Sequence, residues 1–128
     1  MLLCNFEKMR VLIVEQEKTL LQSLCYFMGQ HKDLEVSPAH SVREGMSLWK
    51  AVPFDVILCA DRLPDGDGLI MLKKILAKKP QIISILMTSQ RDDRLRQEAF
   101  AAGIRGYLEK PFDLKQLEEV MGVTLPSL

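Results

Sequence analysis

Short continuous runs of apolar residues alternate along this chain with longer stretches in which apolar residues recur every three or four positions. The runs at 11–14, 56–60 and 82–87 consist mostly of aliphatic side chains. Runs of this length predict strands that are covered on both faces, as in a parallel sheet. Residues 106–109 predict one more short strand. Residues 34–39 predict a strand at the margin of the sheet, because Pro38 cannot donate a hydrogen bond to a neighbouring strand.

The stretches between these runs predict amphipathic helices. Their apolar residues fall on one stripe at helical spacing, as do Leu20, Leu24 and Met28 after the first strand. Similar patterns follow positions 41, 68, 92 and 113. We therefore expect a helix after each predicted strand.

Several helix ends carry recognisable capping residues. Ser41 and Glu44 have the spacing of a capping box, in which side-chain oxygens accept hydrogen bonds from the free amides at the start of a helix. Asp113 and Gln116 have the same spacing. Gly103 follows the helix predicted over 92–102, in a position that favours a left-handed conformation.

Five strands interleaved with five helices predict an α/β fold, with a doubly wound parallel sheet and right-handed crossovers. The chain has 128 residues, of which 48% are hydrophobic, so it can bury one core and is too short for a second domain of ordinary size. We expect an N-terminal extension over 1–9, one domain over 10–122, and a tail or the start of a linker over 123–128.

The charges of the chain balance, with 17 basic and 17 acidic residues. No overall charge therefore draws the chain by itself to nucleic acid or to an anionic membrane. The 3 cysteines have no C-x-x-C spacing and suit a reducing cytoplasm. The first residues lack the features of a signal peptide, and no run reaches the roughly 20 apolar residues that span a bilayer. We expect a soluble cytoplasmic protein.

Residues with possible chemistry stand at the ends of the predicted strands: Glu15 and Gln16 after the first, Ala60 and Asp61 at the third, Thr88 at the fourth and Lys110 after the fifth. The carboxyl ends of parallel strands meet at one edge of the sheet, and such sheets bind ligands there. Ala60 lies at this edge and carries no group that can do chemistry.

Four motifs in this order resemble the receiver domain of two-component response regulators, from residue 10 to about residue 121. They are the run Val11–Val14 followed by acidic residues, the loop Leu-Pro-Asp-Gly-Asp-Gly at 63–68, the pair Thr88-Ser89, and Gly-Tyr-Leu-Glu-Lys-Pro-Phe at 106–112. The resemblance implies a flavodoxin-like sheet with strand order 2-1-3-4-5 and a signalling role without enzymatic activity. It also implies a cis peptide before Pro111.

Receivers of this kind bind magnesium through an acidic pair after the first strand, and they take a phosphoryl group from a histidine kinase on an aspartate. The resemblance places the acidic pair at Glu15 and Gln16, and the acceptor at Ala60, four residues before the loop proline. An alanine methyl cannot attack phosphorus, and Gln16 is neutral. The sequence therefore predicts a degenerate receiver without a cofactor, which binds magnesium weakly, at Glu15 and Asp61 if at all.

The resemblance gives switch roles to Thr88, Tyr107 and Lys110. In the family, the threonine contacts the phosphoryl group, the tyrosine swings inward, and the lysine pairs with the acceptor and the phosphate. The plain alternatives are a strand-end hydroxyl, a half-buried core tyrosine and a solvated lysine. The implied partners are a histidine kinase or phosphotransfer protein, an output domain in the same protein, and a second copy bound through the fourth helix, fifth strand and fifth helix.

Other functions stay open. Phosphotransfer would persist if Asp61 or Asp65 replaced the acceptor, although alternation along the strand points Asp61 away from the pocket, as a solvated carboxylate. Another alternative is that Ala60 is an engineered replacement of the acceptor aspartate in a working parent receiver. Gln16 favours natural decay instead, because a single designed mutation would not also alter this position. A flavodoxin-like domain that binds a nucleotide or flavin phosphate is disfavoured, because the acidic segment 15–17 would repel phosphate.

Overall fold

The structure is a computed structural model that describes residues 8–123. The predicted extension and tail therefore lie almost entirely outside the described residues. Strands and helices alternate along the chain: β1 (Met9–Val14), α1 (Lys18–Gly29), β2 (Leu34–Ala39), α2 (Val42–Ala51), β3 (Val56–Ala60), β4 (Arg62–Leu63), β5 (Gly66–Asp67), α3 (Gly68–Lys78), β6 (Ile83–Thr88), α4 (Asp93–Ala101), β7 (Gly106–Glu109) and α5 (Leu114–Met121).

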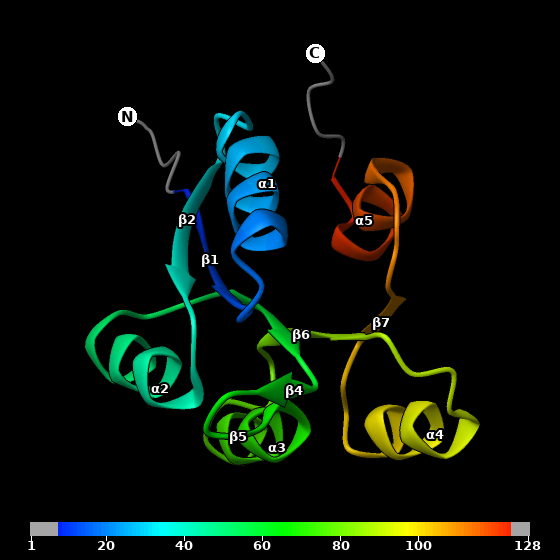
Figure 1. Ribbon diagram of the computed structural model, residues 1–128. Coiled ribbons are helices and arrows are strands. Elements are labelled where there is room, and N and C mark those ends of the chain that lie inside the picture. The colour runs from blue at the N-terminus through cyan, green and yellow to red at the C-terminus, as the bar shows by residue number, and fades with distance from the viewer. Residues whose placement is uncertain (1–7, 124–128) are drawn as a thin grey trace.

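The main sheet has five strands in the order β2-β1-β3-β6-β7, and every neighbouring pair is parallel. This confirms the predicted doubly wound sheet, its strand order 2-1-3-4-5 and its five helices. In Figure 1, α1 and α5 cover one face of the sheet, while α2, α3 and α4 cover the other. Strand β2, which contains Pro38, lies at an edge as predicted.

Each face of the sheet has its own apolar layer. In β1, Leu12 packs in the layer on the side of α3, and the next residue, Ile13, packs in the layer on the side of α1. Ile57 and Leu58 divide in the same way in β3, because successive strand residues point to opposite faces. All five residues of β3 are buried. This central strand therefore fixes the position of Ala60 at its carboxyl end.

The predicted helix caps are present with one difference. The Ser41 hydroxyl accepts a hydrogen bond from the Glu44 amide at 3.1 Å. The Glu44 carboxylate, however, accepts from the His40 amide at 2.7 Å, whereas a capping box requires it to accept from the Ser41 amide. The capping box predicted at the start of α2 is therefore wrong in this second hydrogen bond. The His40 ring lies 3.1 Å from the same carboxylate oxygen, which favours this partner. Asp113 and Gln116 form the complete capping box predicted for α5.

Two backbone expectations are also confirmed. Gly103, after α4, has a φ of 99°, which is the left-handed conformation that favours glycine. The Lys110–Pro111 peptide is cis, as the family resemblance implied.

A small hairpin was not predicted. β4 and β5 pair antiparallel, with Arg62 opposite Asp67 and Leu63 opposite Gly66, around the turn at Pro64 and Asp65. Strands of two residues are too short for the hydrophobic pattern to reveal. The hairpin lies directly after β3, so it forms one wall beside the carboxyl edge of the sheet.

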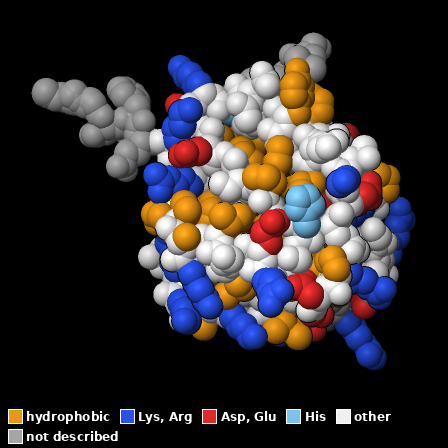
Figure 2. All heavy atoms as spheres, turned by 60° about the vertical axis from the view of Figure 1, so that its left-hand side comes forward, with side chains coloured by type: hydrophobic (Ala, Val, Ile, Leu, Met, Phe, Trp, Pro, Cys, Tyr) orange, Lys and Arg blue, Asp and Glu red, His pale blue; other side chains and the backbone are white. Residues whose placement is uncertain are grey.

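The surface carries charges of both signs. Figure 2 shows the side of the molecule that includes β2 and α2, where Lys and Arg side chains are spread over the surface with acidic side chains among them. Within residues 8–123, no helix is long and apolar enough to cross a membrane.

Candidate functional site

The polar residues of the strand ends meet at the carboxyl edge of the sheet. The backbone ladder continues just past the strands, because the Glu15 amide bonds to Ala39 O at 2.9 Å and the Asp61 amide to Met87 O at 2.9 Å. Ala60 lies between these ends and is only 1% exposed. The backbone of this edge is therefore held by hydrogen bonds, and Ala60 is buried within it.

An ion pair crosses this edge. Lys110 Nζ donates to Glu15 Oε1 at 2.6 Å, and the side chains of Lys110 and Glu15 are 18% and 1% exposed. The other carboxylate oxygen of Glu15 accepts from the Glu17 amide at 2.9 Å. Strands β3 and β6 lie between β1 and β7, so the pair reaches across the ends of both. Lys110 is thus not a solvated lysine, and both Glu15 oxygens are occupied.

Asp61 is placed differently from the expectation of a solvated carboxylate, which is wrong. It is 9% exposed, and its Oδ2 accepts a hydrogen bond from the Thr88 hydroxyl at 2.8 Å. The reason is that β3 ends at Ala60, so strand alternation no longer directs the next side chain. The Asp61 carbonyl accepts from the Gly68 amide at 2.8 Å, and this turn directs the carboxylate to the end of β6.

Thr88 connects Asp61 to the loop between β6 and α4. The Thr88 side chain is fully buried, and its hydroxyl accepts from the Gln90 amide at 3.0 Å. The side-chain amide of Gln90 faces the Arg62 guanidinium, so we assign its oxygen to that side, where it accepts two hydrogen bonds at 2.7 Å each; in this orientation the amide nitrogen no longer donates to Asp61 Oδ2, from which the facing atom lies 3.4 Å away. Sequence patterns gave no signal for Gln90 and Arg62, because a loop and a two-residue strand carry no periodicity.

Tyr107 lies next to this loop, on β7. It is half-buried, as expected, and its hydroxyl is buried without a hydrogen-bond partner among the described residues. Burial, and then the Glu109 carboxylate, raise the pKa of Tyr107 above its ordinary value. The Arg96 guanidinium lies 5.5 Å from the ring centres of both Tyr107 and Phe100, a distance typical of cation–π contacts.

The other acidic residues near the loop are used in the local structure. Asp65 accepts from the amides of Val42 and Arg43 at 2.8 and 2.9 Å, so it fastens the hairpin to the start of α2. These two amides lower the pKa of the Asp65 carboxyl. Asp67 caps α3 by accepting from the Leu69 amide at 2.8 Å. Both carboxylates thus accept hydrogen bonds from amides at the starts of helices, and neither is hydrogen-bonded to a strand-end residue of the site. This argues against Asp65 as a substitute acceptor.

Two small residues fit closely beneath the edge. Cys59 is fully buried, as expected for a core residue, and burial raises the pKa of its thiol far above the ordinary value. Gly68 packs against the Ala60 carbonyl so closely that a Cβ atom at this position would overlap it. The chain therefore passes directly over the end of β3.

The donor set does not fit a magnesium ion. Mg²⁺ requires octahedral oxygen ligands, usually with one or two carboxylates. Here Ala60 offers no side-chain oxygen, the Glu15 carboxylate is bound to Lys110, and Gln16 is exposed. In residues 8–123, no group of three or more His, Cys, Asp or Glu side chains is arranged to hold a metal ion.

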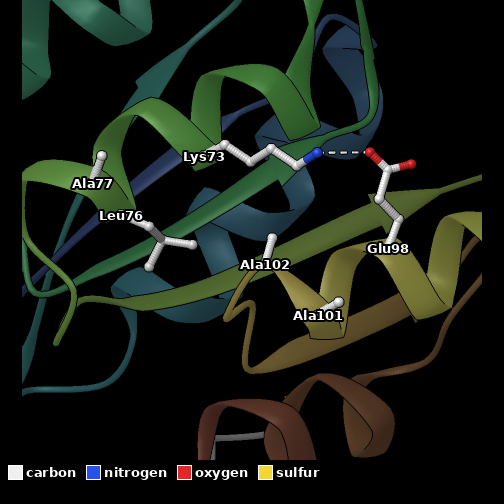
Figure 3. A pocket seen from close by; sticks show the side chains of 6 residues that line it. All are labelled: Lys73, Leu76, Ala77, Glu98, Ala101 and Ala102. Carbon is white, nitrogen blue, oxygen red and sulfur yellow. Dashed lines mark hydrogen bonds and ion pairs between the residues drawn. The ribbon is translucent and has the colours of Figure 1, made fainter.

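A separate groove lies between α3 and α4. Its volume is about 530 Å³, and it is lined by Lys73, Leu76, Ala77, Glu98, Ala101 and Ala102. Figure 3 shows the Lys73–Glu98 ion pair, with a length of 2.6 Å, which bridges the two helices across the groove. None of the strand-end residues lines it, so the groove is not part of the candidate site.

The fold and the site define a class. The molecule is a flavodoxin-like α/β domain whose carboxyl edge gathers two carboxylates, a lysine and a threonine hydroxyl from four neighbouring strand ends. The comparisons with known proteins then give the family.

The family model of the response regulator receiver domain matches residues 11–121, and the chain belongs to this family. Among curated proteins, the chain is 32% identical over 118 residues to the response regulator protein PilR of Pseudomonas aeruginosa, which covers 92% of this chain and 26% of PilR. It is 31% identical over 110 residues to the DNA-binding transcriptional activator DevR/DosR of Mycobacterium tuberculosis, which covers 85% of this chain and 50% of that protein.

A solved structure agrees with this assignment. The non-phosphorylated HemR receiver domain from Leptospira biflexa superposes with a TM-score of 0.82 at 30% identity, covering 94% of this chain and 100% of that one. The chain thus spans a whole receiver domain, but only about a quarter of PilR and half of DevR/DosR. The matching family is therefore the receiver family, and not a flavin- or nucleotide-binding family as in the disfavoured alternative.

Proposed function

We propose that this chain is a receiver domain that accepts no phosphoryl group at position 60, has no catalytic activity of its own, and acts in the cytoplasm through contacts with other proteins. The observation that carries the proposal is the ion pair of Lys110 and Glu15 across the ends of β3 and β6. In a phosphorylated receiver, the carboxylate would be needed to bind the metal ion, and the lysine would be needed to pair with the acceptor carboxylate and the phosphate. Here the two charges neutralise each other, beside a methyl group.

The partners follow from the family. PilR and DevR/DosR are longer proteins with regulatory functions, so we propose an output domain, a histidine kinase or a phosphotransfer protein as the partner of this domain. We further propose a second copy as a partner, through α4, β7 and α5, where Phe100 is 43% exposed beside Tyr107. Both kinds of contact use a preformed surface and need no chemistry at Ala60.

The test is phosphorylation by a small donor. After incubation with acetyl phosphate and Mg²⁺, intact mass measurement is expected to show no acid-labile adduct of phosphoryl mass. An adduct mapped to Asp61 would instead support the alternative of a working receiver with a substitute acceptor. That alternative has one observation in its favour, because Asp61 lies buried against the Thr88 hydroxyl.

A positive control comes from restoring the missing groups. Ala60→Asp alone is expected to restore phosphorylation only in part, since Gln16 leaves the metal short of a carboxylate. The double variant Gln16→Asp/Ala60→Asp is expected to react markedly faster, because a metal ion neutralises charge on the transferred phosphoryl group. Equal rates for the single and double variants would mean that Ala60 is the only defect, as in an engineered chain.

A further inference from the structure

The Asp61 carboxylate is buried without a positive partner. It is 9% exposed, and it forms no ion pair among the described residues. Its principal hydrogen bond is with the Thr88 hydroxyl at 2.8 Å. A buried carboxylate is costly unless it accepts hydrogen bonds, so this contact is strongly favoured over a free hydroxyl.

The hydrogen bond to Asp61 also determines which further hydrogen bonds the Thr88 hydroxyl can form. A hydroxyl has one proton to donate, and its lone pairs then accept from other directions. Because the proton of Thr88 points to Asp61, the lone pairs are free for the Gln90 amide, which donates at 3.0 Å. The carboxylate thus orients the hydroxyl, and the hydroxyl in turn holds the backbone of the loop.

The same loop is held at a second point. The Gln90 side-chain oxygen accepts two hydrogen bonds from Arg62 on β4, at 2.7 Å each. Residues 89–92 lead directly into α4, whose N-cap is Asp92. The position of this loop therefore sets where α4 begins, and α4 carries the Arg96 side chain that stacks on Tyr107.

We propose that Asp61 is an internal latch, which holds Thr88, the β6–α4 loop and the start of α4 in one arrangement without any phosphoryl group. This inference rests on the proposed function, since it explains how a receiver with no phosphorylation input presents its α4–β7 surface. The carboxyl group that acts on Thr88 belongs to the chain itself, one residue after the position of Ala60.

The test measures amide hydrogen exchange of Gln90 by NMR in the unphosphorylated protein. Asp61→Ala is expected to raise the exchange rate of this amide by roughly ten- to a hundred-fold, as expected for the loss of a hydrogen bond to a charged group. Thr88→Val is expected to have the same effect, and the double variant Asp61→Ala/Thr88→Val to add little further. Thr88→Ser keeps the hydroxyl and is expected to keep the protection.

Two controls separate the latch from general loss of stability. Asp33→Ala removes an exposed carboxylate and is expected to leave Gln90 unchanged. The amides of β1 report global unfolding, and their protection is expected to persist in every variant. If Asp61→Ala does not fold, the isosteric Asp61→Asn is measured instead, and its weaker neutral bond is expected to give a smaller rise.

The outcomes distinguish the two proposals. Exchange of Gln90 within about twofold of wild type in both Asp61→Ala and Thr88→Val would overturn the latch, whereas the lack of a phosphoryl adduct on wild-type protein would still support the proposed function. An adduct on wild-type protein would overturn the proposed function, whatever the exchange of Gln90 in the unphosphorylated state.

Discussion

Gly68 illustrates how closely the chain packs above the end of β3. Gly68→Ala would place a Cβ atom against the Ala60 carbonyl and the Cys59 sulfur, with backbone on one side that cannot give way. We expect a loss of stability of about 3 kcal/mol, at the upper end for overpacking, measured by urea unfolding. Gly29→Ala is the matched control, because no atom lies within 4 Å of the added methyl group. That variant is expected to be neutral, or more stable by about 0.5 kcal/mol.

Lys110 neutralises the buried carboxylate of Glu15. Lys110→Met leaves the buried Glu15 carboxylate without its cation, and we expect a loss of about 3 kcal/mol in the free energy of unfolding. The double variant Glu15→Gln/Lys110→Met removes both charges and keeps an acceptor for the Glu17 amide. It is expected to be more stable than Lys110→Met alone. If the single and double variants unfold at the same urea concentration, the ion pair has no such role.

Among the elements, the hairpin and α2 depend on one carboxylate. The amides of Arg43 and Val42 lower the pKa of Asp65, so the stabilisation is complete above the ordinary value of 3.8 and is lost as the pH falls through the lower, folded-state pKa. Asp65→Asn is therefore expected to be less stable than wild type at pH 6. The difference is expected to narrow at pH values below the folded-state pKa.

Urea unfolding of wild type and Asp65→Asn, at pH 6 and at a pH below the folded-state pKa of Asp65, measures the contribution of this carboxylate. Asp33→Asn, which changes an exposed aspartate on another loop, is the matched control and is expected to differ little from wild type at either pH. A difference between wild type and Asp65→Asn that stays constant on acidification would contradict the role of the ionised carboxylate.

The pattern of apolar residues predicted the elements that bury a face, and it failed where no face is buried. The five main strands and the helices were predicted from this pattern, because the β3 run and the helix stripes each serve a core layer, while the order of the strands was implied by the family resemblance. The β4–β5 hairpin was missed, since two-residue strands show no alternation.

The sequence predicted which strand ends meet at the carboxyl edge, but it predicted neither their contacts nor the presence of Gln90 and Arg62 beside them. The strand ends place Glu15, Thr88 and Lys110 at one edge, which the α/β order predicts. The orientation of Asp61 depends on the turn after β3, so the rule of alternating side chains gave the wrong result. Gln90 contributes through its backbone amide and through the side-chain oxygen that faces Arg62, and a residue in a loop belongs to no periodic pattern that would reveal either contact.

For the molecule as a whole, the proposed contact with a second copy is testable on the α4–β7–α5 face. Phe100→Glu places a charge at its exposed apolar residue, and we expect it to shift the protein from dimer toward monomer in sedimentation velocity over a range of concentrations. Tyr26→Glu is the control, because Tyr26 is 48% exposed on α1, which is not one of the three elements of this face (Figure 1). Wild-type protein that stays monomeric at all concentrations would rule out this contact.

The ion pair of Lys110 and Glu15 has a consequence for the lifetime of the fold. Its residues are 95 positions apart, and they come together only when β7 has joined a sheet that already contains β1, β3 and β6. Contacts that close such long loops form late, because the entropy of loop closure must be overcome first. Interactions absent from the folding transition state slow unfolding and leave the folding rate unchanged. This pair therefore lengthens the time for which each molecule stays folded, while the speed at which it folds is set elsewhere in the sheet.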